Sequence, residues 1–70
     1  MKVYATDPRY AVDIMVIDHD ETFVANAVSC DGDSYGMDSF WFNIGYFKSL
    51  KAAQKSAIRQ MAAHNLEVKF

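Results

Sequence analysis

The sequence lacks the features that exported and membrane proteins of this size depend on. Its single cysteine cannot form a disulfide within the chain, so a secreted scaffold held by disulfides is excluded and a reducing, cytoplasmic setting is expected. The first residues become polar at Thr6, before an apolar stretch of signal-peptide length accumulates. No apolar run approaches the roughly 18 to 20 residues of a membrane-spanning helix, the longest being 14–17. We therefore expect a soluble cytoplasmic protein with no membrane segment.

Catalytic motifs are also missing from the sequence. It contains no glycine-rich phosphate loop, no G-x-G-x-x-G and no G-x-S-x-G. Cys30 with His19 or His64 could supply a thiol and a base, but Cys30 ends an apolar segment, where a small buried residue is expected. The carboxylates occur in polar segments that nothing in the sequence would desolvate. We expect a protein that is not an enzyme and has no cofactor.

Two acidic segments raise the question of a metal site. Asp31, Asp33 and Gly36 match positions 1, 3 and 6 of a calcium loop, but Phe42 occupies position 12, where a bidentate Glu is needed. The segment 18–20, Asp-His-Asp, has no zinc-ligand spacing with other residues. We expect no metal site and interpret both segments as exposed turns.

The pattern of apolar residues predicts one α+β domain over residues 1–70. Alternation predicts strands over 10–17 and 22–30, and an aromatic third strand over 37–47 after the glycine-containing turn 31–36. Residues 3–5 are expected to pair at an edge of the sheet, and 66–70 to return as a short last strand. The predicted fold is an antiparallel sheet of three to four strands with one C-terminal helix on one face, in the order ββ(β)αβ.

The helix is the most strongly indicated element. Ser49 is suited to an N-cap, no Gly or Pro occurs from Leu50 to His64, and Asn65 suits the left-handed position after a helix. Apolar residues at helical spacing predict the stripe that contacts the sheet; these are Leu50, Ala53, Ala57, Ile58 and Met61.

Strict alternation along the aromatic strand predicts which of its residues are exposed. One face would hold Phe40, Phe42, Ile44 and Tyr46, and the other Trp41, Asn43, Gly45 and Phe47. One of these faces is needed as core beneath the helix. We expect Trp41 and Phe47, with Met15 and Ile17 of the first long strand, to form apolar surface on the uncovered side and to bind a partner.

Charge divides between the two halves of the chain. Residues 1–38 contain eight acids and two bases, and residues 39–70 contain one acid and five bases, within a total charge of −2. The acids expected to bind a partner lie at the two turns: Asp18, Asp20, Glu21, Asp31 and Asp33. The bases recur along one face of the predicted helix, which is also the pattern of an ordinary solvated face: Lys48, Lys51, Lys55 and Arg59.

Two resemblances concern the start of the helix. The stretch 47–57, with its Ser, paired Lys and Ala residues, resembles the entry to the last helix of double-stranded RNA-binding domains. The first helix of that fold is absent here, so its RNA activity is not carried over. The order of three strands and a helix, with Phe47 two residues before Ser49 and with spaced alanines, is similar to partial RNase H-like antitoxin domains. Neither likeness implies a function for this chain.

Three functional interpretations follow. The first is a non-enzymatic protein-binding module, such as a phage or mobile-element inhibitor of a host nucleic-acid machine, whose acidic turns imitate phosphates and whose apolar sheet face adds contact. The alternative is a DNA- or RNA-binding regulator that uses the basic helix face. The third is a structural homodimer or subunit with no separate ligand, and whether Trp41 is covered in the free protein discriminates it from the other two.

Overall fold

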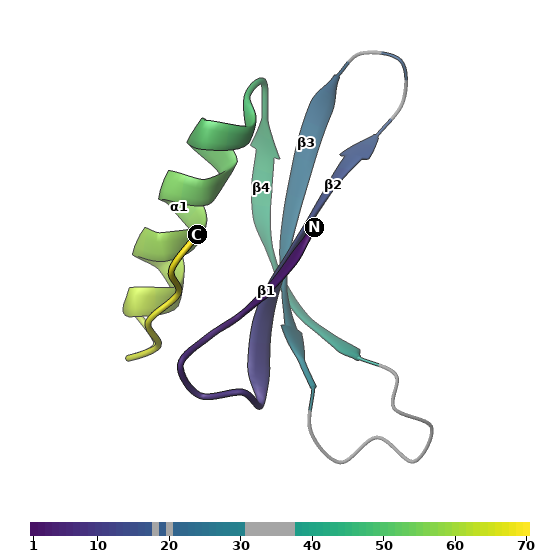
Figure 1. Cartoon of the computed structure of the whole chain (residues 1–70). Helices are drawn as coiled ribbons and strands as arrows, with labels where there is room; N and C mark the ends of the chain where they lie inside the picture. Colours follow the sequence, from purple (N-terminus) through teal and green to yellow (C-terminus); the bar gives the residue numbers. More distant parts are fainter. Residues whose placement is uncertain (18, 20, 31–37) are drawn as a thin grey trace.

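The computed structural model describes residues 1–17, 19, 21–30 and 38–70. Over these residues the chain forms four strands and one helix: β1 (Lys2–Tyr4), β2 (Tyr10–Ile17), β3 (Thr22–Ser29), β4 (Ser39–Phe47) and α1 (Leu50–Ala62). The strands make an antiparallel sheet in the order β1-β2-β3-β4, and α1 lies across one face of it (Figure 1). The predicted α+β fold with an edge strand near Val3 is confirmed. In this part of the chain no helix is long and apolar enough to cross a membrane.

The predicted last strand over 66–70 is reduced to a single bridge. Val68 pairs with Ala5, and the N–H of Thr6 donates to the carbonyl of Glu67 at 2.8 Å. Pairing stops there because the backbone after Ala5 turns away to enter β2. Val68 is nevertheless buried, so this segment closes the core on the side of β1.

Both ends of α1 are capped as the sequence predicts. The side chain of Ser49 accepts a hydrogen bond from the N–H of Ala52 at 3.1 Å. At the other end Asn65 adopts the left-handed conformation, with φ 63°. The N–H of Asn65 donates to the carbonyl of Ala62 and the N–H of Leu66 to that of Met61, which is the Schellman arrangement.

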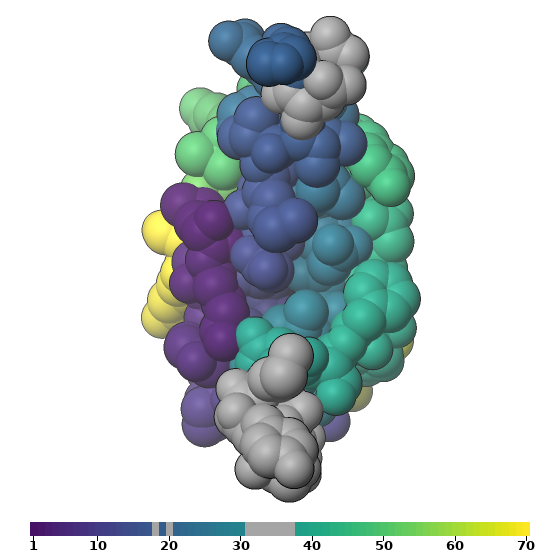
Figure 2. Space-filling model, turned by 90° about the vertical axis from the view of Figure 1, so that its right-hand side faces the viewer, coloured from purple at the N-terminus to yellow at the C-terminus, as the bar shows by residue number. Residues whose placement is uncertain are grey.

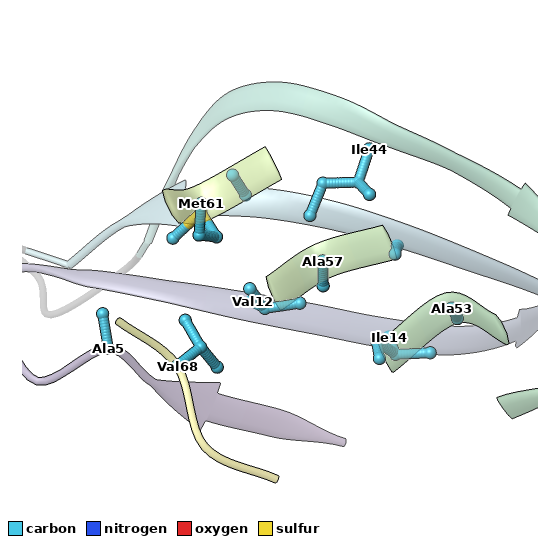
Figure 3. Packing of buried hydrophobic residues seen from close by; sticks show 10 residues of the cluster. Ala5, Val12, Ile14, Ile44, Ala53, Ala57, Met61 and Val68 are labelled. Atoms are coloured by element: carbon cyan, nitrogen blue, oxygen red, sulfur yellow. The ribbon is translucent and has the colours of Figure 1, made fainter. Parts of the chain in front are cut away.

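The core lies between α1 and the sheet. Ala53, Ala57 and Met61 are fully buried at every fourth position of the helix and face Val12 and Ile14 of β2 and their neighbours on β3 and β4 (Figure 3). Alanine at two of these positions lets the helix backbone approach the sheet closely. The predicted apolar stripe is therefore narrower than expected, because Leu50 and Ile58 lie beside the line of contact and are exposed.

Strand β4 contains two irregularities that change which side chains share a face. Ala25 pairs with Gly45 while Asn26 pairs with Asn43, so Ile44 is one extra residue on β4. Ala27 pairs with Phe42 while Val28 pairs with Phe40, which makes Trp41 a second extra residue. A strand that gains a residue at a bulge reverses the alternation of its faces. The prediction of strict alternation along β4 is therefore wrong.

Side-chain amides compensate for the disrupted pairing at the first bulge. The amide of Asn43 donates to the Asn26 side-chain oxygen at 2.9 Å and to the backbone carbonyl of Ala25 at 3.4 Å. From the helix, the amide of Gln60 donates to the carbonyl of Ile44 at 3.0 Å. These contacts satisfy backbone carbonyls at and beside the first bulge.

Gly45 has a backbone conformation that other residues rarely adopt, with φ 151°. A Cβ built on it would lie 2.9 Å from Cζ of the Phe47 ring. We expect Gly45→Ala to lower the free energy of unfolding by about 1–3 kcal/mol, because the backbone is strained and the ring has to move. Lys51→Ala, at an exposed helix position, should change it by no more than about 0.5 kcal/mol. Urea unfolding of both variants measures this, and an unchanged midpoint for Gly45→Ala would contradict it.

Candidate functional site

The face of the sheet opposite α1, called the open face below, is not covered by any helix among the described residues. Figure 2 shows the molecule from this side, with the strands following one another from β1, purple at the left, to β4, green at the right. The strand register arranges its side chains in three rows that cross the strands. The first row contains Tyr4, Ala11, Val28 and Phe40, the middle row Lys2, Asp13, Asn26 and Asn43, and the third row Met15, Val24 and Tyr46.

The first and third rows present exposed apolar side chains above a closed floor. Four residues carry these side chains: Phe40 is 67% exposed, Tyr46 64%, Tyr4 53% and Met15 50%. Beneath and between them Ala11, Val24 and Val28 are buried, although α1 lies on the opposite side of the sheet. The aromatic residues at both ends of β4 therefore stand on a packed apolar base and not on an open cavity.

The middle row is polar and is held in place by side-chain contacts. Lys2 donates to Asp38 at 2.7 Å and lies over the ring of Tyr4, 4.9 Å from its centroid. The Asn26 and Asn43 side chains are joined by the hydrogen bond described above. Asp13 is half-buried and forms no ion pair with any residue that the structure describes. The row thus separates the two apolar rows with a line of polar groups and one unpaired carboxylate.

Lys2 controls the ionisation of Asp38. The hydrogen bond from Lys2 holds the pKa of Asp38 below its usual range; desolvation opposes this, and a hydrogen bond with Cys30 adds a smaller lowering. The same ion pair raises the pKa of Lys2. Asp7 provides an independent case, because hydrogen bonds from the side chain and backbone of Arg9 lower its pKa.

The expected location of Trp41 and Phe47 on the open face is wrong. Both pack against the core on the side of α1, because the bulges at Trp41 and Ile44 shift the alternation of β4. The Trp41 ring lies within 5 Å of three other rings, those of Tyr10, Phe42 and His64. Met15 does lie on the open face, as expected.

The sequence alone did not predict that Phe40 and Tyr46 are exposed on the open face. An isolated glycine inside a strand is a signal of a bulge, and Gly45 gave that signal. Nothing local marked the second bulge at Trp41, because a run of aromatic residues fits either face of a strand.

The acidic residues chosen from the sequence fall mostly outside the described structure. Glu21 is exposed, with φ 54°, immediately before β3. Asp18, Asp20, Asp31 and Asp33 lie outside the described residues. The two connections that contain these acids join β3 at Thr22 and at Ser29, which are opposite ends of the strand.

Three of the four bases predicted from the sequence, Lys51, Lys55 and Arg59, lie on the outer side of α1, away from the sheet, and Lys48 lies just before the helix. All four, Lys48, Lys51, Lys55 and Arg59, are exposed. Among the described residues none of them forms an ion pair. The buried alanines therefore lie on one side of the helix, and the charged side chains on the other side are all basic.

The described part of the chain holds no group of three or more His, Cys, Asp or Glu side chains arranged to bind a metal ion, and no pocket was found in the structure around these residues. Cys30 is half-buried directly after β3. The calcium-loop positions Asp31, Asp33 and Gly36 lie outside the described residues.

Comparison with known family models, with curated proteins and with solved structures found no match, so function is inferred from the residues of this chain.

We expect Lys2→Gln to raise the pKa of Asp38 towards its usual value, because the hydrogen bond from the ammonium group is lost. In the native chain, Asp38 stabilises the fold above its unfolded-state pKa, and this contribution is lost as pH falls through the lower folded-state pKa. A carboxyl-carbon NMR titration of the variant measures the shift. Asp7 is the internal control, since Arg9 sets its pKa. An unchanged Asp38 midpoint would show that Lys2 is not the cause.

Proposed function

We propose that the protein is a non-enzymatic binding module that receives another protein on the open face. The observation that carries the proposal is the exposure of Phe40, Tyr46, Tyr4 and Met15 over a floor of buried valine and alanine. Aromatic residues and methionine are enriched at the centres of protein interfaces, where they bury much apolar area at low cost in side-chain entropy. The floor of buried residues supports these side chains before the partner arrives.

Charge specifies the chemistry of the partner. On the open face Lys2 is paired with Asp38, whereas Asp13 has no ion-pair partner among the described residues and Glu21 is exposed at one end of the sheet. The connections on either side of β3 add Asp18, Asp20, Asp31 and Asp33 in the sequence. A partner with an apolar patch bordered by Lys and Arg is complementary to this distribution.

Proteins that bind nucleic acid present such basic borders. The specific form of the proposal is therefore an inhibitor or regulator of a nucleic-acid machine, of the kind that phages and mobile elements encode, acting in the cytoplasm. Nucleic acid itself is disfavoured on this face, because its phosphates would meet unpaired carboxylates. Strand addition at β4 is disfavoured as well, because two bulges interrupt the regular backbone of that edge strand.

The double variant Phe40→Ser with Tyr46→Ser tests this assignment. A tagged wild-type chain is used to retain proteins from nuclease-treated lysate of the source cells, and the retained protein is then titrated by calorimetry. We expect the double variant to bind that protein at least ten times more weakly, because two exposed aromatic anchors are lost. A matched control replaces two exposed apolar residues outside the three rows, Ile58→Ser with Phe70→Ser, and should bind as the wild type does.

The outcomes separate this function from its alternatives. Equal binding by both double variants would contradict the open face as the contact surface, provided that circular dichroism shows both to be folded. Retention of no protein above background would contradict a protein partner. A wild-type dimer that Phe40→Ser with Tyr46→Ser converts to a monomer would make a second copy of the chain the occupant of this face.

A further inference from the structure

We propose that the outer face of α1 binds the phosphate backbone of double-stranded nucleic acid. The basic stripe, defined as Lys48, Lys51, Lys55 and Arg59, advances by three, four and four residues, so the three bases within α1 share one helix face. This face is on the opposite side of the helix from the buried Ala53 and Ala57. The proposal concerns a different surface and a different ligand from the open face.

Ion pairing distinguishes this stripe from the two bases near the N-terminus, whereas Lys69 also has no acidic partner among the described residues. Lys2 and Arg9 each have an acidic partner at 2.7 Å, in Asp38 and Asp7. No member of the basic stripe has one among the described residues, and α1 contains no acid at all. Its four charges are therefore not neutralised by any described side chain, although the chain as a whole is acidic.

The arrangement is electrostatically unfavourable for the helix itself. Lys51 and Lys55, and Lys55 and Arg59, are like charges four residues apart, a spacing that destabilises helices. Lys51 lies in the first turn, where the helix dipole favours acids, and no acid is present there. A face whose role was only to be solvated would gain stability from glutamates at these positions. The stripe is instead suited to a ligand that supplies negative charge.

The shape of the outer face favours a duplex as that ligand. The outward side chains beside the bases include the small Ala52 and, after Arg59, the small Ala62, both exposed, so the helix is slender on this side. The major groove of DNA, about 12 Å wide, admits a helix of this kind. Lys51 to Arg59 extends over about 12 Å at about 1.5 Å per residue, a length along which duplex DNA carries several phosphates. The helix has no aromatic residue on which unpaired bases could stack, which disfavours a single strand.

The placement of the stripe allows both ligands to bind at once. Figure 1 shows α1 on one side of the sheet, and the open face lies on the other. A protein on the open face and a duplex on the helix would therefore not compete for the same surface. When both are bound to one chain, the partner protein and the duplex would have a high effective concentration relative to each other.

Fluorescence anisotropy with a labelled 20-base-pair DNA duplex of arbitrary sequence, from 50 to 200 mM KCl, tests the proposal. Four phosphate contacts predict a slope of about −3.6 in log K against log salt, which is roughly a 150-fold loss of affinity over this range. Lys51→Gln with Lys55→Gln and Arg59→Gln should bind at least tenfold more weakly at 50 mM KCl and reduce the slope to about −0.9. Glutamine has nearly the helix propensity of Lys and Arg, so the variant should remain folded.

The matched control removes the same amount of charge elsewhere, by Lys2→Gln, Arg9→Gln and Lys69→Gln, and should bind as the wild type does. No binding at 50 mM KCl, or equal weakening by both triple variants, would overturn the proposal. Polyglutamate or phosphatidylserine vesicles that compete as well as unlabelled duplex would overturn nucleic acid as the ligand. The variant Phe40→Ser with Tyr46→Ser should bind duplex normally, so failure of the open face and failure of the basic stripe are distinguished.

Discussion

The close contact between α1 and the sheet determines the rest of this structure. Ala53, Ala57 and Met61 pack directly on the strands. The basic stripe therefore lies on the outer side of α1, and the exposed aromatic residues lie on the face of the sheet that α1 does not cover. In the described part of the chain α1 covers one face of the sheet and no helix covers the other, so that face is closed by the strands' own side chains. Valines 24 and 28 are buried there beneath larger neighbours, and those neighbours become the exposed surface of the molecule.

The sequence was sufficient to predict the helix because the signals for a helix are local. Ser49 and Asn65 act within a few residues of themselves, and the buried positions recur at a spacing that only a helix makes into one face. The arrangement of β4 was not predictable in the same way. Its first bulge is held by Asn26 from β3 and by Gln60 from α1, residues that are 17 and 16 positions from their partners. Such contacts are visible only once the strands are paired.

The contrast between local signals and contacts over long sequence distances also explains which functional residues could be predicted. Exposure of the basic stripe could be predicted, because it depends only on the helix and on which side of it is apolar. Exposure of Phe40 and Tyr46, and the packing of Trp41 and Phe47 under the helix, depended on two bulges whose positions the alternation of apolar residues does not encode. A chain with aromatic residues on both sides of a strand gives no local preference for one face, so the register decides which rings are offered to a partner.

Because the core is small, binding at either surface changes the stability of the whole domain, although the two surfaces bind different ligands. A domain of about this size buries a modest fraction of its surface, so its free energy of unfolding is low and a ligand that binds only the folded state raises it appreciably. Occupation of the open face would therefore stabilise α1, and occupation of the basic stripe would stabilise the sheet, although the two faces share no side chain. Changes at Met61 or Gly45 would weaken both kinds of binding together through unfolding. Changes at Tyr46 or Lys55 would each affect one ligand, because each side chain projects from only one side of the contact between helix and sheet.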